Sequence, residues 1–344
     1  MPTTSPSHPH PTQRLAVGVV GAGRFGALHA QKAALGARMD LVGVHDLDKE
    51  RGQVVARAAN CAFWPDFSAM LGACDAVVVA TPAGTHAALT SAALQAGCHV
   101  LVEKPIATTL GDARTLGALA QRQGKVLQVG HLLRYSAEHA LVTARMKRPL
   151  YVEATRLAPF SLRGTDTSVV LDLMIHDLDF ILSVMGGEVA GVEAMGAAVS
   201  STSADIANAR VRFSNGAVAT LTASRISLKT ERKMRFFGAE GYLSVDFGQR
   251  KAAFINRHEG LVLPGTVPMG TDGQRGSNFR RAAMAWKNRD LIALEQAAFA
   301  ASCLDGAPVM VDAAAATRAL EAALRVNAAM AANRATLESA GLLP

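Results

Sequence analysis

The sequence predicts an α/β protein with a doubly wound parallel sheet in its first half and a second α/β domain with an open, mainly antiparallel sheet. Three observations support this fold class. Apolar strand-like runs alternate with helical segments up to about residue 130. A glycine-rich turn joins the first strand to the first helix. Between residues 191 and 256, β segments follow one another directly.

The length of the chain indicates two domains. At 344 residues it exceeds the size at which a single hydrophobic core stops growing. We place a first domain at 15–131 and a second at 132–344. Residues 1–14 are rich in Pro, Ser, Thr and His and have almost nothing to bury, which predicts a disordered tail. The irregular segment 264–278 predicts either a mobile flap or a tolerated insertion.

A dinucleotide-binding fingerprint follows the first expected strand. The apolar run 15–20 predicts a buried strand, and 25–35 predicts a helix that Gly36 ends. The turn between them reads G-A-G-R-F-G and contains Gly21, Gly23, Arg24, Phe25 and Gly26. In this pattern the first glycine permits a tight turn, the second lets backbone approach a pyrophosphate, and the third lets helix pack on strand. The helix N-terminus behind the turn favours an anion, so the segment predicts a dinucleotide site.

An acidic residue ends the next expected strand, 41–44. Asp46 lies about 20 residues after Gly26, where an acid binds the ribose 2′-hydroxyl of a dinucleotide. Glycine-rich turns also occur at ordinary strand–helix junctions, so it is the strand, helix and acid together that favour cofactor binding. An acid would repel a 2′-phosphate and therefore favours NAD, although basic side chains elsewhere could compensate and allow NADP.

Two further segments fall at strand ends in the first half. Strands are expected at 61–64, 75–82, 99–102 and 126–130, and helices at 49–59, 67–71, 85–96 and 110–123. Ligands of parallel sheets bind at the carboxyl ends of the strands. Thr81 and Pro82, with His86 shortly after them, fall at one such end, and Glu103-Lys104-Pro105 falls at the next.

Glu103-Lys104-Pro105 is unusual because proline ends the strand ladder and two charges follow an apolar run. A surface turn with an ion pair is the structural alternative. The functional alternative is a lysine directed into the cofactor cleft, where it hydrogen-bonds a substrate oxygen and tunes a proton transfer.

The second half has one helix that carries chemistry. Residues 169–185 combine an apolar stripe with a polar stripe containing Asp172, His176 and Asp179. An acid and an imidazole four residues apart can meet on one helix face. The pair is open to three interpretations: surface decoration, a metal site with Asp179, or a general base that the acid orients. No other residues supply ligand spacing, so we expect no metal.

The remaining elements of the second half are mostly strands. Helices are expected at 136–147, 290–304 and 312–332, and strands at 151–156, 191–200, 206–213, 217–226, 233–237, 242–247 and 251–256. Asn215-Gly216 is typical of a hairpin turn.

Three motifs together resemble the glucose–fructose oxidoreductase, inositol dehydrogenase and rhizopine-catabolism family (Gfo/Idh/MocA). They are GAGRFG after the first strand, ATPAGTH after the fourth and VLVEKP at the fifth. The resemblance runs from about residue 15 to the last helix. It implies an N-terminal Rossmann domain, a C-terminal α/β domain with an open antiparallel sheet, and a bound nicotinamide dinucleotide.

The resemblance also implies roles for individual residues. Asp172 and His176 are similar to the family's D-x-x-x-H signature, which implies that His176 takes the proton of the substrate hydroxyl as hydride leaves for the nicotinamide. Asp172 then positions the hydroxyl or the histidine, and Lys104, with a cis bond to Pro105, supports the oxygen. The implied cofactor contacts are Gly21, Gly23, Arg24, Phe25, Gly26, Asp46, Thr81, Pro82, His86, Glu103 and Lys104.

The sequence departs from the family pattern at two places. His131 stands where many members carry an aromatic residue, and Ser168-Val169 stand where paired glycines are common. The second departure puts the shape of the pocket wall in doubt.

A basic cluster in the second half invites a functional and a structural interpretation. It consists of Arg225, Lys229, Arg232, Lys233 and Arg235, with Glu231 among them. The structural interpretation is a solvent-exposed sheet edge whose charges prevent pairing with another chain. The alternative is a clamp for a diphosphate. Together with this cluster, the segments VVLDLMIHDLD and DIANARVRFSNGAVATLTASRIS are similar to the branch of the family that oxidises UDP-N-acetylglucosamine at C3. We expect substrate contacts at Arg134, Tyr135, Arg156 and Arg225.

The sequence therefore predicts an NAD(P)-dependent dehydrogenase that oxidises a secondary hydroxyl of a sugar, with a UDP-linked amino sugar as one candidate substrate. An inositol or polyol dehydrogenase, an NAD-dependent glycosidase and a non-catalytic cofactor-binding sensor are the alternatives. The resemblance implies a homodimer or homotetramer that assembles through the open sheet.

Composition excludes several other classes. Charged residues make up 18% of the chain and the net charge of +7 is spread over both halves, which argues against a nucleic-acid surface. No apolar run is long enough for a membrane helix, and no signal peptide is expected. The four cysteines lack metal or redox spacing and are typical of reduced thiols in a cytoplasmic protein.

Overall fold

The structure is a computed structural model that describes residues 13–161, 167–257, 266–268 and 279–342. The chain forms two compact units. The first contains the described residues of Met1–Gly130 and Asp290–Ala314, and the second those of His131–Arg289 and Ala315–Pro344. Most of the expected tail at 1–14 and of the segment 264–278 lies outside the described residues.

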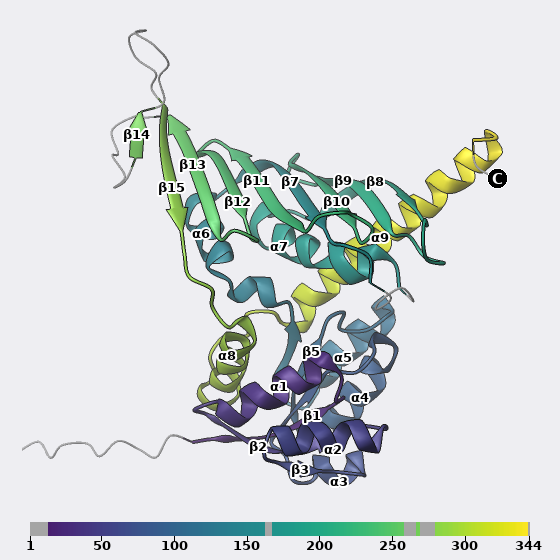
Figure 1. Cartoon of the computed structure of the whole chain (residues 1–344), viewed down its shortest axis with the longest axis vertical. Coiled ribbons are helices and arrows are strands. Elements are labelled where there is room, and N and C mark those ends of the chain that lie inside the picture. Colours follow the sequence, from purple (N-terminus) through teal and green to yellow (C-terminus); the bar gives the residue numbers. More distant parts are fainter. Residues whose placement is uncertain (1–12, 162–166, 258–265, 269–278, 343–344) are drawn as a thin grey trace, which may run out of the picture. The chain divides into compact units, whose positions relative to one another are not determined.

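The first unit is built on a six-stranded parallel sheet in the order β3-β2-β1-β4-β5-β6 (Figure 1). Its strands are β1 (Leu15–Val20), β2 (Met39–His45), β3 (Ala62–Phe63), β4 (Ala76–Val79), β5 (His99–Glu103) and β6 (Leu127–Gly130). The central strands are apolar throughout, as expected for a sheet covered on both faces; all four residues of β4 are buried. The doubly wound parallel sheet is confirmed.

Helices connect these strands in alternation. They are α1 (Arg24–Leu35), α2 (Lys49–Ala58), α3 (Phe67–Leu71), α4 (Ala83–Gln95) and α5 (Leu110–Arg122). Asp48 caps α2 by accepting a hydrogen bond from the Arg51 amide at 3.0 Å, and Asp66 caps α3 through the Ser68 amide at 2.8 Å. A further helix, α8 (Leu291–Asp305), packs beside α1 in the same unit.

The second unit is built on a nine-stranded sheet in the order β14-β15-β13-β12-β11-β7-β10-β9-β8. Its strands are β7 (Pro149–Leu157), β8 (Val189–Ala197), β9 (Ile206–Phe213), β10 (Val218–Ser224), β11 (Glu231–Gly238), β12 (Gly241–Asp246), β13 (Lys251–Arg257), β14 (Thr266–Pro268) and β15 (Phe279–Ala285). Only the β7–β10 pair is parallel among these pairings, so the mainly antiparallel sheet is confirmed.

The strand β15 is one that the sequence analysis does not anticipate. It pairs antiparallel with β13, where Ala253 lies opposite Ala283. Three of the seven residues in its sequence, FRRAAMA, are alanine, a residue that is depleted in strands. Pairing with β13 therefore decides its conformation.

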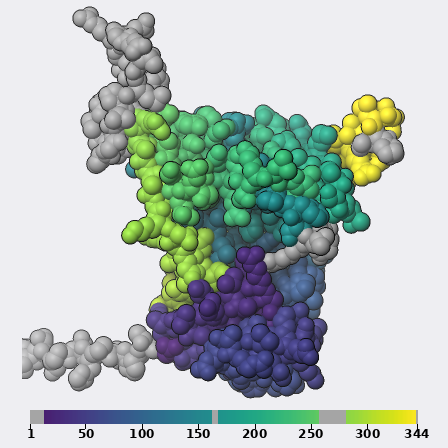
Figure 2. All heavy atoms as spheres, viewed as in Figure 1, coloured from purple at the N-terminus to yellow at the C-terminus, as the bar shows by residue number. Residues whose placement is uncertain are grey.

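Helices cover one face of this sheet. They are α6 (Ala137–Arg145), a π-helical turn (Val170–Met174) continuing into α7 (Ile175–Met185), and α9 (Ala313–Ser339), all on the same side in Figure 1. Their apolar side chains form one core with the inward-facing residues of the strands. This core includes Phe180 on α7, Phe236 on β11 and Ala323 on α9. None of the described helices covers the other face, and Figure 2 shows the strands of this sheet, teal to green, at the surface.

Candidate active site

The glycine-rich turn has the geometry that a pyrophosphate requires. Gly21 has a φ of 96°, a region that favours glycine. A Cβ at Gly26 would lie 1.7 Å from the carbonyl oxygen of Gly21, so the third glycine is what lets α1 approach the turn. A Cβ at Gly23 would meet nothing within 4 Å, which leaves its backbone open to a ligand. The turn therefore fits a dinucleotide at the N-terminus of α1.

Asp46 lies beside this turn and is already hydrogen-bonded. Its carboxylate accepts from the amide of Ala22 at 2.5 Å and from the amide of Asp48 at 2.8 Å. Arg51 adds two contacts, at 2.7 Å through Nη2 and 3.3 Å through Nε. Burial alone would raise the pKa of Asp46, but the hydrogen bonds from Arg51 and the two amides outweigh it and lower the pKa. Asp46 is thus held as an anion beside the glycine-rich turn.

Arg51 is a residue that the sequence analysis missed. Arg51 lies in the first turn of α2, five residues after Asp46. In dinucleotide-binding folds, an arginine near the acidic residue at the end of the second strand can accommodate the 2′-phosphate of NADP. The signal was available in the sequence as an arginine five positions after the acid.

The segment after β4 is tied to the proline after β5 by His86. This ring is 1% exposed, and its Nδ1 lies 2.7 Å from the carbonyl oxygen of Pro105. Its Nε2 lies 2.9 Å from the carbonyl oxygen of Thr81. Both ring nitrogens therefore contact backbone, and His86 holds together two of the segments expected to meet the cofactor.

Glu103 belongs to a buried network that joins three elements of the first unit. Its Oε1 lies 2.9 Å from Nε2 of His29 on α1, and its Oε2 accepts from the Lys104 amide at 3.3 Å. Gln296 on α8 approaches His29 Nδ1 at 3.1 Å. Burial by itself would raise the pKa of Glu103. The hydrogen bond from His29 and the charge of Lys104 outweigh burial, so the pKa of Glu103 lies below its ordinary value. The network supports Lys104, which is half-buried and precedes a cis bond to Pro105.

A second buried carboxyl group, that of Glu295 on α8, lies near Glu103. It is 0% exposed, and neither of its carboxyl oxygens has a hydrogen-bond partner among the described residues. Burial, with the nearby Glu103 charge, raises the pKa of Glu295 well above its ordinary value. No sequence motif indicates His29, Glu295 or Gln296, because the network is formed by elements far apart in the chain.

In the second unit, Asp172 and His176 lie where the π-helical turn passes into α7. Asp172 belongs to the turn Val170–Met174 and His176 to the first turn of α7, and both are half-buried. Single π-turns within α-helices occur frequently at functional sites. The continuous α-helix expected over 169–185 is therefore corrected at its first turn.

A second His–Asp pair lies beside His176. His131 Nδ1 is 3.9 Å from Oδ2 of Asp179, and the two side chains are 1% and 2% exposed. Arg134 Nη1 lies 3.9 Å from the other oxygen of Asp179. The His131 ring meets the His176 ring edge-on, with centroids 6.5 Å apart. Arg134 and Tyr135 share a short 3₁₀ helix, Leu132–Tyr135.

Two expected substrate contacts are buried in ion pairs. Arg156 donates to both oxygens of Asp177, at 2.8 and 2.5 Å. Arg225 donates to Asp205 at 2.8 Å and to the Thr167 carbonyl oxygen at 2.7 Å. Both guanidinium groups therefore hold parts of the second unit in place: Arg156 holds α7, and Arg225 holds the segment that leads into the π-helical turn.

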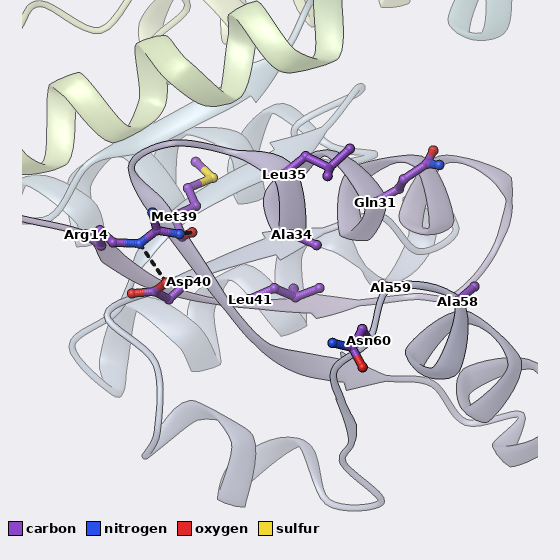
Figure 3. A pocket seen from close by; sticks show the side chains of 10 residues that line it. All are labelled: Arg14, Gln31, Ala34, Leu35, Met39, Asp40, Leu41, Ala58, Ala59 and Asn60. Atoms are coloured by element: carbon purple, nitrogen blue, oxygen red, sulfur yellow. Dashed lines mark hydrogen bonds and ion pairs between the residues drawn. The ribbon is translucent and has the colours of Figure 1, made fainter.

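A surface hollow of about 450 Å³ lies at the opposite end of the first sheet (Figure 3). Its wall includes Arg14, Met39 and Asp40, at the amino ends of β1 and β2. Arg14 is bound to Asp40 at 2.7 Å and to the carbonyl oxygen of Ala37 at 2.8 Å. Because ligands of parallel sheets bind at the carboxyl ends, this hollow is not the candidate site.

Among the described residues, no group of three or more His, Cys, Asp and Glu side chains could hold a metal ion. In the same part of the chain, no helix combines the length and apolar character needed to cross a membrane.

Comparison with known proteins agrees with this geometry. The family profile described as "Oxidoreductase family, NAD-binding Rossmann fold" matches residues 15–131, and the "GFO/IDH/MocA C-terminal domain" profile matches 140–244. The UDP-N-acetylglucosamine 3-dehydrogenase of Acidithiobacillus ferrooxidans is 40% identical over 318 residues, which cover 92% of this chain and 97% of that protein. The chain belongs to the Gfo/Idh/MocA oxidoreductase family. Its cofactor is therefore NAD-type, as the sequence predicts.

A solved structure and a second relative agree with this family assignment. A solved structure of UDP-N-acetylglucosamine 3-dehydrogenase GnnA from A. ferrooxidans has a TM-score of 0.83 and 37% identity, covering 93% of this chain and 98% of that one. An inositol 2-dehydrogenase from Acidothermus cellulolyticus is 32% identical over 192 residues, covering 52% of this chain and 56% of that protein. The family and the class, an NAD-binding oxidoreductase, are thereby established.

Proposed function

We propose that this protein oxidises the C3 hydroxyl of a UDP-linked N-acetylamino sugar and transfers the hydride to NAD. The observation that carries the proposal is the 40% identity, over 92% of this chain, to a UDP-N-acetylglucosamine 3-dehydrogenase. The residue types that the chemistry needs are all present, as Lys104, Asp172 and His176.

In the proposed reaction, bound NAD supplies the hydride acceptor. A ring nitrogen of His176 removes the proton of the substrate hydroxyl. Asp172, in the π-helical turn that precedes His176, orients the hydroxyl or the imidazole. Lys104 donates a hydrogen bond to the same oxygen and stabilises the negative charge that develops there as the proton leaves.

Absorbance of NADH tests the proposal with purified protein, NAD and a panel of UDP-sugars, free sugars and inositols. We expect NADH with UDP-N-acetylglucosamine. The variants Lys104→Ala and His176→Ala should reduce turnover by about 10²- to 10⁴-fold, the range for a lost proton-transfer group, while NAD still binds. Lys49→Ala, which removes an exposed charge on α2, is the control. Retained turnover in either site variant would remove that residue from the mechanism.

A free polyol is the second candidate substrate. The 32% identity to an inositol 2-dehydrogenase favours it, although over only half of the chain. NADH formation with free inositols and none with UDP-sugars would establish this candidate. Release of a free sugar without net NADH would indicate the glycosidase alternative, and cofactor binding without any turnover would indicate a sensor.

We also propose a cytoplasmic homodimer or homotetramer that assembles through the uncovered face of the nine-stranded sheet. An apolar row crosses this face, with Val218, Tyr151, Phe237, Tyr242 and Ile255 opposite one another on successive strands. The Phe237 ring lies 4.9 Å from the Tyr242 ring, centroid to centroid. Light scattering tests the assembly by measuring the molar mass in solution. We expect the mass of a dimer or tetramer for the wild type and that of a monomer for Phe237→Lys.

The cytoplasmic location is supported by the cysteines. All four are free thiols, as expected in a reducing compartment.

A further inference from the structure

The basic cluster of the second unit is divided between the two faces of β11 and its neighbours. Its five cations are Arg225, Lys229, Arg232, Lys233 and Arg235. Side chains alternate between the faces of a strand. Met234 and Phe236 are buried in the core on the helix-covered face, so Arg232 shares that face, whereas Lys233 and Arg235 lie on the other.

Four of the five cations are neutralised by carboxylates. Arg225 is 3% exposed and is paired with Asp205, as described above. The ammonium of Lys229 lies 2.7 Å from Glu231, and that of Lys233 lies 3.6 Å from the same side chain. The buried pair gives Arg225 a structural role, and the two lysines share the carboxylate of Glu231 at the surface.

Arg235 is the fourth neutralised cation. Its Nη1 lies 3.2 Å from Glu153 on the neighbouring strand β7, and both side chains are exposed. Arg235 therefore lies on the uncovered face of the sheet, away from α7.

Arg232 differs from the other four. It lies directly opposite Arg156 in the β11–β7 pairing, on the face that α7 covers. Arg156 contacts both oxygens of Asp177, and none of the described carboxylates forms an ion pair with Arg232. The Asp177 carboxylate is therefore engaged by Arg156, and Arg232 lies beside this pair without an ion pair of its own to a described carboxylate. Partial burial, followed by repulsion from Arg156, lowers the pKa of Arg232, and the attraction of Asp177 only partly offsets this.

The position of Arg232 relates it to the proposed base. Asp177, the carboxylate nearest to the two arginines, directly follows His176 in α7. Arg232 is exposed to solvent as a whole residue, although it lies on the face that α7 covers. A guanidinium that is partly shielded from water and has no ion pair with a described carboxylate favours a phosphate group, to which it can donate two parallel hydrogen bonds.

We infer that Arg232 binds the diphosphate of a nucleotide-linked substrate and thereby sets the preference for that substrate over the free sugar. The inference rests on the proposed function, because only a UDP-linked substrate brings a diphosphate close to the hydroxyl that His176 deprotonates. In a UDP-amino sugar, the diphosphate is attached at C1, two carbons from the C3 hydroxyl. Arg225, the candidate from the sequence, acts instead through Asp205 as a positioning residue.

The test compares Arg232→Gln with Arg235→Gln, which removes the same charge from the same strand but from the uncovered face. The affinity for UDP alone is measured by calorimetry with NAD at saturation, so that UDP does not occupy the dinucleotide site. KM and kcat are measured with UDP-N-acetylglucosamine. Arg232→Lys is included because it keeps the charge and loses the two-point geometry. Thermal unfolding shows whether each variant is folded.

We expect Arg232→Gln to weaken UDP binding and raise KM by about 10- to 100-fold, the range for a lost charge-assisted hydrogen bond, with kcat nearly unchanged. Arg232→Lys should lie between Arg232→Gln and the wild type, and Arg235→Gln should match the wild type. Equal UDP affinity in Arg232→Gln and the wild type overturns the inference, as does an equal loss in Arg235→Gln.

The two proposals fail in distinguishable ways. If the wild type oxidises UDP-N-acetylglucosamine and Arg232→Gln binds UDP as tightly, the function stands and the role of Arg232 is wrong. If the wild type binds UDP but does not oxidise the UDP-sugar, the function fails, and the UDP affinities still decide the role of Arg232. A wild type that does not bind UDP overturns the inference outright.

Discussion

Arg156 and Asp177 form a buried, two-point ion pair in the second unit. The guanidinium Nε lies 2.8 Å from Oδ2 and Nη2 lies 2.5 Å from Oδ1, and both side chains are less than a tenth exposed. Arg156 belongs to a central strand of the sheet and Asp177 to α7, so the pair connects the sheet to the helix that carries His176.

Breaking this pair is expected to destabilise the second unit. Asp177→Asn leaves the Arg156 charge buried and uncompensated, and we expect a loss of about 3–5 kcal/mol in the free energy of unfolding, measured with urea. Glu153→Gln breaks the exposed pair with Arg235 and should cost less than about 1 kcal/mol. Similar losses in the two variants would show that the buried pair does not stabilise the fold.

Glu295 is expected to make stability depend on pH. Its pKa is raised in the folded state, so its contribution is complete below the unfolded pKa near 4.5 and is lost as pH rises towards the folded pKa. Glu295→Gln removes this dependence. Over pH 5–8 the difference between variant and wild type should shift in favour of the variant, by up to about 1.4 kcal/mol per pH unit.

Urea unfolding of both proteins at several pH values measures the effect of Glu295. Glu338→Gln, which removes an exposed acid on α9, is the matched control and should run parallel to the wild type. Parallel curves for Glu295→Gln as well would mean that Glu295 ionises normally in the folded protein.

Arg51 is expected to influence the choice between NAD and NADP. Its removal frees Asp46 for the ribose hydroxyls and eliminates the cation nearest to the position of a 2′-phosphate. Arg51→Ala should therefore raise the ratio of NAD to NADP affinity by about tenfold, a difference of about 1.4 kcal/mol. Fluorescence titration with both reduced cofactors measures the ratio.

Asp46→Asn is the companion variant and should lower the same ratio, because it removes the charge that repels a 2′-phosphate. An unchanged ratio in Arg51→Ala would show that the arginine serves only to hold Asp46 in the free protein.

The cysteines are expected to react slowly with alkylating agents. Burial raises the pKa of Cys74 and of Cys303 to about 12, and it also raises the pKa of Cys61 and Cys98. Because the thiolate is the nucleophile, iodoacetamide at pH 8 should modify the native protein far more slowly than the unfolded protein. Mass spectrometry counts the modified thiols. Rapid labelling of Cys74 or Cys303 in the native state would contradict the burial argument.

Local patterns predicted most of the first unit. The strand 15–20 and the caps at Asp48 and Asp66 are found as expected, because apolar runs and capping side chains act over a few residues. The π-helical turn at Val170–Met174 was not predictable, since the sequence there has the period of an ordinary helix. β15 escaped prediction for the same kind of reason, because its pairing with β13 and not its composition makes it a strand.

The sequence by itself determined the chemistry that this protein can carry. The spacing of Gly21, Gly23 and Gly26, with Asp46 after the second strand, specifies a dinucleotide site because backbone freedom and close approach are local properties of glycine. Only the tertiary structure decided how the charges are used. Asp205 directly precedes β9 and Arg225 directly follows β10, and the antiparallel register of these two strands brings them together. The register of β11 on β7 places Arg232 opposite Arg156 without a carboxylate of its own among the described residues, because charge pairing depends on segments that meet only when the chain is folded.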